Sequence, residues 1–129
     1  MTQTDNSFEN ARQIDETGNE YWSARDLQGL LDYSTWQKFS AVIDKAQIAC
    51  AQSGYAVPDH FNQTVKMVSI GSGAQRQQPD YKLSRYACYL IVQNGDPSKS
   101  VIAAGQTYFA VQTRRQELQD EEAFRQPGE

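Results

Sequence analysis

Residues 83–113 have the sequence LSRYACYLIVQNGDPSKSVIAAGQTYFAVQT, in which two helix signals follow each other. Ser84 can accept a backbone hydrogen bond at a helix start, and apolar residues then recur at helical spacing as far as Asn94-Gly95, a typical helix end. Asp96-Pro97 indicates a second helix start, because proline is tolerated in a first turn. The stretch therefore predicts two consecutive helices, the second of which continues into the charged residues 114–117.

Two further helices are predicted nearer the N-terminus. Residues 11–15 and 20–22 flank a Gly-Asn turn and are typical of a β-hairpin. Ser23 then begins a short helix that ends near residues 32–33. Ser34-Thr35 begins an amphipathic helix with apolar residues from Trp36 to Cys50, and Gly54 ends it as a left-handed cap. Adjacent helices of this kind resemble a helix-turn-helix, although their turn lacks the glycine often found in that motif.

A hairpin with a long loop is predicted between the two pairs of helices, after one short turn at Pro58. Residues 65–70 alternate and are β-branched, so they indicate a strand. Residues 71–80 form a polar loop, or wing, and residues 81–83 return as a second strand. The fold class is therefore α+β, with helices packed on small antiparallel β-hairpins. The core is expected to include Trp36, Phe39, Leu90, Tyr108 and Phe109.

The length of 129 residues is that of one domain. We expect a disordered lead-in over residues 1–10, a domain over residues 11–119 and an acidic tail over residues 120–129. No apolar run approaches the roughly 20 residues of a membrane span, and the N-terminus lacks the features of a signal peptide. Cys50 and Cys88 lie in apolar patterns and are expected to be reduced core residues. These features predict a cytoplasmic protein without membrane contact.

The charges are distributed unevenly along the chain. The net charge is −4, but residues 1–20 and residues 117–129 each carry five acids and one base. Residues 21–116 therefore hold six acids and ten bases, a net of +4. One explanation is that the acidic ends are simply solvated termini and that the basic body is an ordinary protein surface. They also fit a basic face for an anionic partner, with acidic ends that limit non-specific binding.

Residue patterns that carry catalysis are sparse. His60 is the single histidine, Cys50 and Cys88 lack the spacing of a metal site, and Gly71-Ser72-Gly73 is not followed by the Lys-Ser/Thr of a phosphate loop. We therefore expect no enzyme, no cofactor and no metal. A nuclease remains as a third class of function, because Asp26, Asp32 and Asp44 could converge in space.

Exposed cations interleaved with aromatic and amide side chains give a better signal. Arginine and amide groups can hold phosphates and hydrogen-bond to base edges. Arg76, in the predicted wing, is expected to share one contact surface with the first two helices. The alternative for each cation is simple solvation. The candidate binding residues are Arg25, Lys38, Lys45, Arg76, Arg114 and Arg115.

Two stretches carry a family resemblance. Residues 22–27, WSARDL, with residues 30–34, LLDYS, resemble the N-terminal helix motif of BRO-type and antirepressor domains. Residues 83–97 and 101–115 are similar, nearly residue for residue, to the DNA damage-inducible protein D family. Residues 59–61 and 68–72 also fit that family. The resemblance covers roughly residues 8–126.

The resemblance implies a bacterial protein of the SOS response, or a prophage relative, without catalytic residues. A member of that family restrains the RecA recombinase, so the implied partner is RecA or a RecA–single-stranded DNA filament, with direct DNA contact left open. The alternative is a phage-type antirepressor that binds a repressor protein, which the low pI of 4.9 favours. Family members usually continue with a charged helical segment, and the acidic tail fits its beginning. The oligomeric state does not follow from the sequence.

Overall fold

Helices and strands alternate along residues 4–125, which the computed structural model describes. The elements in chain order are α1 (Thr4–Asn10), β1 (Gln13–Ile14), β2 (Glu20–Ser23), α2 (Ala24–Leu30), α3 (Trp36–Gln52), α4 (Val57–His60), β3 (Phe61–Ser69), β4 (Gln75–Leu83), α5 (Arg85–Gln93) and α6 (Ser100–Arg125). Helices and antiparallel strands in one such unit confirm the predicted α+β class.

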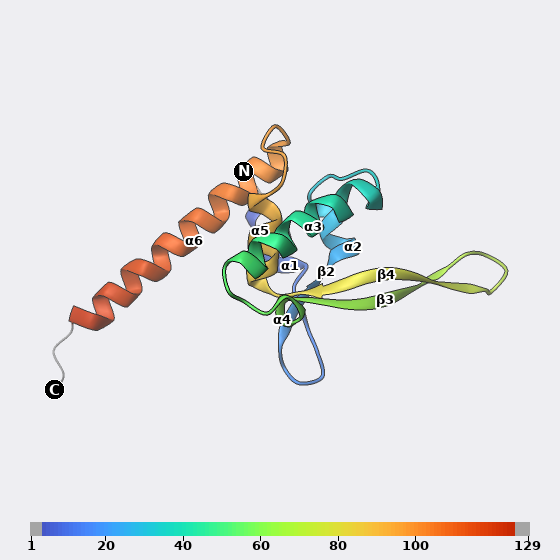
Figure 1. The fold of residues 1–129 in the computed structure, drawn as a ribbon, viewed down its shortest axis with the longest axis horizontal. Helices are drawn as coiled ribbons and strands as arrows, with labels where there is room; N and C mark the ends of the chain where they lie inside the picture. Colours follow the sequence, from blue (N-terminus) through green and yellow to red (C-terminus); the bar gives the residue numbers. More distant parts are fainter. Residues whose placement is uncertain (1–3, 126–129) are drawn as a thin grey trace.

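The four strands form one antiparallel sheet in the order β1-β2-β4-β3. Strand β4 pairs with β2 only at its end, where Trp22 lies opposite Leu83. Strands β3 and β4 pair along their whole length, from Phe61 opposite Leu83 to Ser69 opposite Gln75. The outer part of this pair is therefore a two-stranded ribbon that projects from the domain (Figure 1). Helix α6 leaves the domain at the opposite end (Figure 1).

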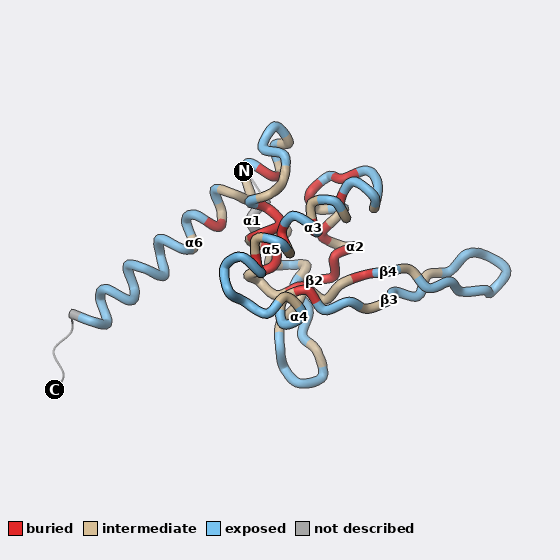
Figure 2. The backbone as a smooth tube through the Cα atoms, in the orientation of Figure 1, coloured by how far each residue is buried: buried red, intermediate tan, exposed pale blue. Residues whose placement is uncertain are grey.

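The core lies where α2, α3, α5 and the first part of α6 meet the root of the ribbon (Figure 2). Phe39, Leu90 and Phe109 are buried there, as predicted. Trp36 and Tyr108 are only half-buried against it, which corrects that prediction. The reason for Trp36 is its place at the first residue of α3, where the ring lies over the edge of the core and meets Arg25 and Tyr81.

The predicted disordered lead-in does not hold for residues 4–10, which form α1. Phe8 stacks on Trp22 with ring centroids 4.4 Å apart, and the indole Nε1 of Trp22 donates to the Phe8 carbonyl at 2.8 Å. These contacts reach 14 residues along the chain, so local sequence patterns cannot show them. Residues 1–3 lie outside the described residues. Of the predicted tail, residues 120–125 continue α6, and residues 126–129 lie outside the described part.

The predicted wing loop is mostly strand. Strand β4 begins at Gln75, so the reversal needs only residues 70–74, in which Gly71 and Gly73 take left-handed backbone angles. The run from Gln75 to Asp80 has little β-propensity, but its backbone pairs with a β-branched strand. Helix α6 also begins later than predicted, because Asp96 accepts hydrogen bonds from the amide and hydroxyl of Ser98 and closes a turn before the helix.

The predicted caps of three helix starts and of the end of α3 are confirmed, whereas α2 ends at Leu30, earlier than the predicted residues 32–33. Side-chain oxygens of Ser23, Thr35 and Ser84 accept backbone hydrogen bonds at the starts of α2, α3 and α5. Gly54 has a φ of 87° just after α3, a conformation that favours glycine. In the turn between α2 and α3, Asp32 takes the left-handed conformation that a glycine would otherwise supply.

Both cysteines are free and buried, as predicted. Cys50 lies on the inner face of α3 and Cys88 on the inner face of α5. Burial raises the pKa of both thiols, that of Cys88 strongly, so both stay protonated at neutral pH. They therefore behave as small apolar core groups.

Candidate nucleic-acid interface

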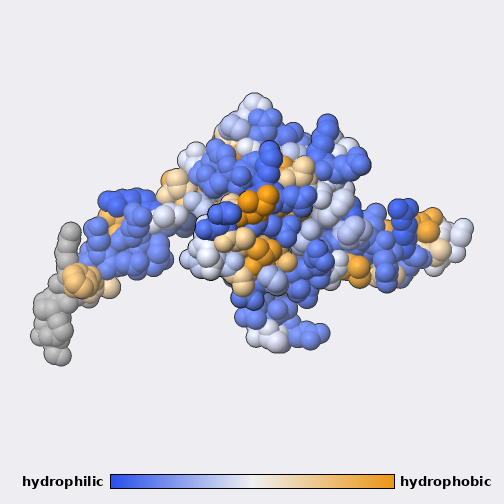
Figure 3. Space-filling view, in the orientation of Figure 1, coloured by the Kyte–Doolittle hydropathy of each residue, from blue (hydrophilic) through white to orange (hydrophobic). Residues whose placement is uncertain are grey.

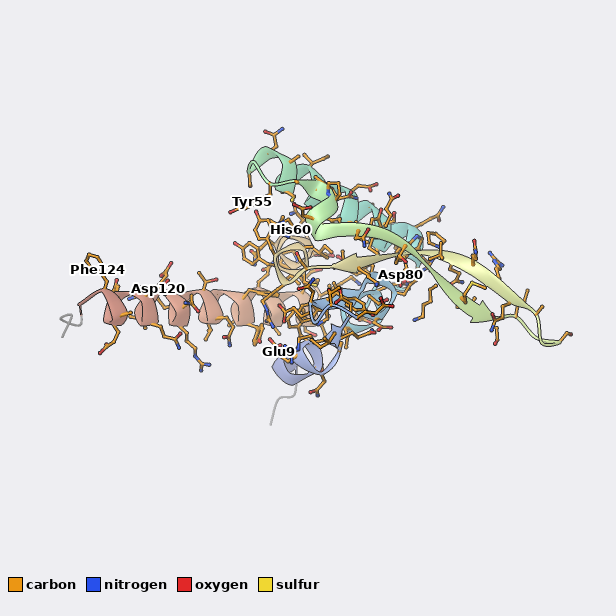
Figure 4. The ribbon with its side chains drawn as sticks, turned by 90° about the horizontal axis from the view of Figure 1, so that it is seen from below. Glu9, Tyr55, His60, Asp80, Asp120 and Phe124 are labelled. Carbon is orange, nitrogen blue, oxygen red and sulfur yellow. The ribbon has the colours of Figure 1, made fainter. Side chains whose placement is uncertain are left out.

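The ribbon is fastened at its root by the buried carboxylate of Asp80. One oxygen accepts a hydrogen bond of 2.7 Å from the hydroxyl of Ser23. The other accepts from the backbone amides of Arg25 at 3.0 Å and Tyr81 at 2.7 Å. Figure 4 shows Asp80 where the ribbon leaves the domain. This carboxylate therefore holds strand β4 against the first turn of α2, and its charge is met by donors inside the fold.

The ribbon has two chemically different faces. Residues opposite each other in an antiparallel pair lie on the same face, and successive residues alternate between faces. The register places Lys66, Arg76 and Lys82 on one face, which we call the cation face, and this face also carries Thr64, Gln78 and the buried Asp80. The other face, which we call the amide face, carries Gln63, Val65, Met67, Gln77, Pro79 and Tyr81.

The cation face is accessible along the projecting part of the ribbon. Arg76 is exposed and makes no hydrogen bond or ion pair with another described residue. The Nζ atom of Lys66 lies 3.4 Å from a carboxylate oxygen of Asp26, but both side chains are more than a third exposed, so this pair is weak. Lys82 lies 4.9 Å above the ring of Tyr21 at the root. The projecting part of the cation face can therefore present Lys66 and Arg76 to an anion.

A groove of about 490 Å³ lies between the ribbon and α3, and residues of both ribbon faces line it. Trp36 and Ser40 line it from the helix, and the ribbon lines it with Gln63, Thr64, Val65, Gln77, Gln78, Pro79, Asp80 and Tyr81. The guanidinium of Arg25 lies 3.8 Å from the ring centroid of Trp36, and its Nε donates to the carbonyl of Pro79 at 2.9 Å. Arg25 thus joins the two walls of the groove. The visible surface of the ribbon is mainly hydrophilic, with a few apolar side chains (Figure 3).

The structure does not bring the six predicted binding residues together. Arg25 lies at the root of the ribbon, and Arg76 lies on strand β4, which corrects its predicted place in a loop. Lys38 and Lys45 are exposed on α3, but at about 100° per residue they lie on the far side of the helix from Ser40, which faces the groove. Arg114 and Arg115 lie on α6, at the opposite end of the molecule from the ribbon (Figure 1).

Two cations of the ribbon were missed in the sequence prediction. Lys66 was assigned to a strand without a role, and Lys82 to a strand too short to have faces. The signal was present, because every second residue from Asn62 to Val68 shares a side. Only the register of β3 against β4 shows that this side also carries Arg76.

A separate ionic cluster joins the N-terminal helix to the body of the domain. The Arg85 guanidinium contacts Glu9 at 2.7 Å and Glu20 at 3.1 Å, and the hydroxyl of Tyr108 donates to Glu9. Figure 4 shows Glu9 beside the base of α6. Hydrogen bonds from Arg85 lower the pKa of both glutamates, while burial and the bond to Glu9 raise the pKa of Tyr108 to about 12. This arginine is used in the fold and is not available to an external anion.

Replacing Arg85 with alanine is expected to destabilise the domain by about 1–2 kcal/mol at pH 7, reduced by the partial solvent exposure of the cluster. Because the pKa values of Glu9 and Glu20 are lowered in the folded state from the usual 4.5, the stability they contribute is complete above that value and is lost as the pH falls through the lowered folded pKa values. Urea unfolding at several pH values should therefore show a shallower acid decline in Arg85→Ala. Arg115→Ala, at an exposed position of α6, is the control, and an unchanged pH profile in Arg85→Ala would contradict the assignment.

The single histidine lies in an aromatic cluster at the end of α4. His60 lies beside Tyr55 and Tyr86, and its Nδ1 is 2.7 Å from the hydroxyl of Ser84 (Figure 4). Among the described residues, no group of three or more His, Cys, Asp or Glu side chains is placed to hold a metal ion. No helix in the same part of the chain is long and apolar enough to cross a membrane.

Comparison of the sequence with known proteins places the chain in a family. Residues 10–110 match the pattern of the BRO family, N-terminal domain. The chain is 56% identical over 126 residues to DNA damage-inducible protein D of Escherichia coli (strain K12), which confirms the resemblance seen in the sequence. The match covers 98% of this chain and 46% of that protein, so the chain spans about half its length. No solved structure matches the chain.

Proposed function

This chain belongs to the BRO family, whose N-terminal domain it contains, and from that premise we propose that it is a non-catalytic binding protein of the DNA-damage response. Its proposed target is a RecA filament on single-stranded DNA in the cytoplasm. The printed name of the E. coli relative, a DNA damage-inducible protein, supports the response. The observation that carries the proposal is the cation face of the ribbon.

Phosphate binding would give a role to the projecting part of the ribbon, which core packing does not require. Beyond its root, the ribbon is exposed on both strands and buries no apolar core (Figure 2). Lys66 and Arg76 stand on its outer part with side chains that can reach an anion. Cations that neutralise phosphates release bound counterions, which gives affinity without dependence on base sequence. Such a surface suits a protein that must bind a nucleoprotein filament wherever it forms.

The test replaces Lys66 and Arg76 together with alanine. Affinity for a labelled 20-nucleotide strand should fall, and the slope of log K against log salt should flatten by about 1.4, since each phosphate contact on a single strand contributes about 0.7. Inhibition of RecA strand exchange should weaken in parallel. Fluorescence anisotropy at several salt concentrations measures the slope.

The matched control replaces Arg114 and Arg115, two arginines at the other end of the molecule. This pair removes the same charge and should leave binding and inhibition close to wild type. Melting temperatures should show that both variants are folded. Full retention of both activities in the Lys66/Arg76 variant would contradict the proposal, and equal losses in the two variants would show a general charge effect instead of a ribbon site.

A phage-type antirepressor is the second candidate, and the outer part of α6 favours it. Val111 and Leu118, two turns apart, expose apolar side chains, and Phe124 is 91% exposed. The acids around them would repel DNA but suit a protein surface. They are Glu117, Asp120, Glu121 and Glu122. In this case a repressor, rather than RecA, would be recovered with the protein after DNA damage.

A further inference from the structure

We infer that the groove between α3 and the ribbon binds unstacked bases of single-stranded DNA. This inference rests on the proposed function, and it assigns bases to the groove and phosphates to Lys66 and Arg76 on the outer part of the cation face. Single strands are bound by stacking bases on aromatic rings and by hydrogen bonds to their edges. The groove offers both kinds of group at one place.

The aromatic part of the groove is provided by Trp36 and Tyr81. Their ring planes differ by 29° and their centroids lie 6.5 Å apart. The wall formed by α3 and the wall formed by the ribbon therefore each carry an aromatic ring, and the two rings have similar orientations. Both rings are half-buried, which fixes their positions while leaving part of each accessible. The Arg25 guanidinium, held by Pro79, packs on Trp36 and adds a planar cation that can also stack on a base.

The polar part is provided by three glutamines. Gln63, Gln77 and Gln78 line the groove, and none of their side-chain amides makes a hydrogen bond to another described residue. Each amide has donors and an acceptor, which match the mixed edges of bases. A packing role does not explain Gln63 and Gln77, because both side chains are exposed, while Gln78 is half-buried.

The charge of the groove distinguishes it from the cation face. Asp80 is the acidic residue in the lining, and its oxygens are taken by Ser23 and two backbone amides. Arg25 is the cation at the groove, whereas Lys66 lies on the cation face of the ribbon. Binding in the groove should therefore depend on bases and little on salt, while binding on the cation face should depend on phosphates and strongly on salt.

The test measures binding of a 20-nucleotide oligo-dT and of an abasic strand of the same length. Wild-type protein should bind oligo-dT more tightly than the abasic strand. Trp36→Ala should weaken oligo-dT binding by about 5- to 150-fold, the effect of one lost base stack, without changing the salt slope. Trp36→Phe, which keeps a ring, should recover most of the affinity. Ile48→Ala, at an exposed position of the same helix, is the control.

Two further measurements do not depend on the stability of Trp36→Ala. Gln77→Ala removes an exposed amide and should weaken oligo-dT binding several-fold. Oligo-dT should quench tryptophan fluorescence in wild type but not in Trp36→Phe, because the remaining Trp22 is fully buried. Equal wild-type affinity for oligo-dT and the abasic strand would overturn the inference.

The same experiments separate this inference from the proposed function. If the abasic strand binds as well as oligo-dT, but the Lys66/Arg76 variant loses binding, the phosphate site stands and the base site fails. If no single strand binds at all, the base site also fails. Inhibition of RecA strand exchange by the wild-type protein then decides the proposed function by itself.

Discussion

Phe39→Ala is expected to lower the free energy of unfolding by about 3–5 kcal/mol, because it removes a large ring from a filled core. The side chain is fully buried on the inner face of α3. Its ring lies 5.3 Å from that of Tyr33 and 6.3 Å from that of Trp36, measured between centroids. The loss therefore includes both transfer of the ring from the core and a cavity that the neighbouring helices cannot close completely.

Urea unfolding measures this effect as a shift in the urea concentration at half-unfolding, with an unchanged dependence of the unfolding free energy on urea concentration. Ile48→Ala is the matched control, since Ile48 lies on the same helix with 63% of its surface exposed. It should change stability by no more than about 0.5 kcal/mol. A loss below about 1 kcal/mol in Phe39→Ala would show that the inner face of α3 is assigned wrongly.

Asp80→Ala is expected to cost about 3 kcal/mol, because it leaves buried donors without an acceptor. Ser23, Arg25 and Tyr81 each donate to this carboxylate in the fold. Without it, the hydrogen bond from Arg25 Nε to the Pro79 carbonyl still joins α2 to β4, but the buried polar links are lost, so the ribbon should be held less firmly. Asp80→Asn keeps one acceptor oxygen and the shape of the side chain, so it should lose roughly half as much.

Asp44→Ala serves as the control for loss of a carboxylate. Asp44 is exposed on α3, so Asp44→Ala should change the free energy of unfolding by no more than about 0.5 kcal/mol. Stability is measured by urea unfolding, and orientation of the ribbon by protection of β3 and β4 amides from hydrogen exchange. Wild-type stability and protection in Asp80→Ala would contradict the role assigned to the carboxylate.

The proposed division of the ribbon explains how an acidic protein could bind nucleic acid. Residues 1–20 and residues 117–129 each carry a net charge of −4, whereas residues 21–116 carry +4. Much of α6 extends away from the ribbon, and its acidic part is therefore far from Lys66 and Arg76 (Figure 1). With a Debye length of about 8 Å at physiological salt, charges that distant hardly affect the ribbon. The local surface, not the total charge, then governs binding.

Features of the fold that depend on neighbouring residues along the chain could be predicted from sequence. Ser23, Thr35 and Ser84 cap helices through backbone amides only three residues away. Gly54 is required by its own backbone angle. The stripe that includes Phe39 and Ile43 follows from helical spacing. The family resemblance also belongs to this level, because it rests on continuous stretches of residues.

The tertiary structure alone decided the parts that depend on distant segments. Trp22 orders α1 by stacking on Phe8, and Asp80 reaches Ser23 across 57 residues of chain. The weak strand propensity of residues 75–80 is overridden by pairing with β3, which moves Arg76 from a loop to a defined face. That register also adds Lys66 to the cation face and separates both from Lys38 and Lys45. Such contacts depend on how the segments dock, and a local pattern of residues does not encode the docking.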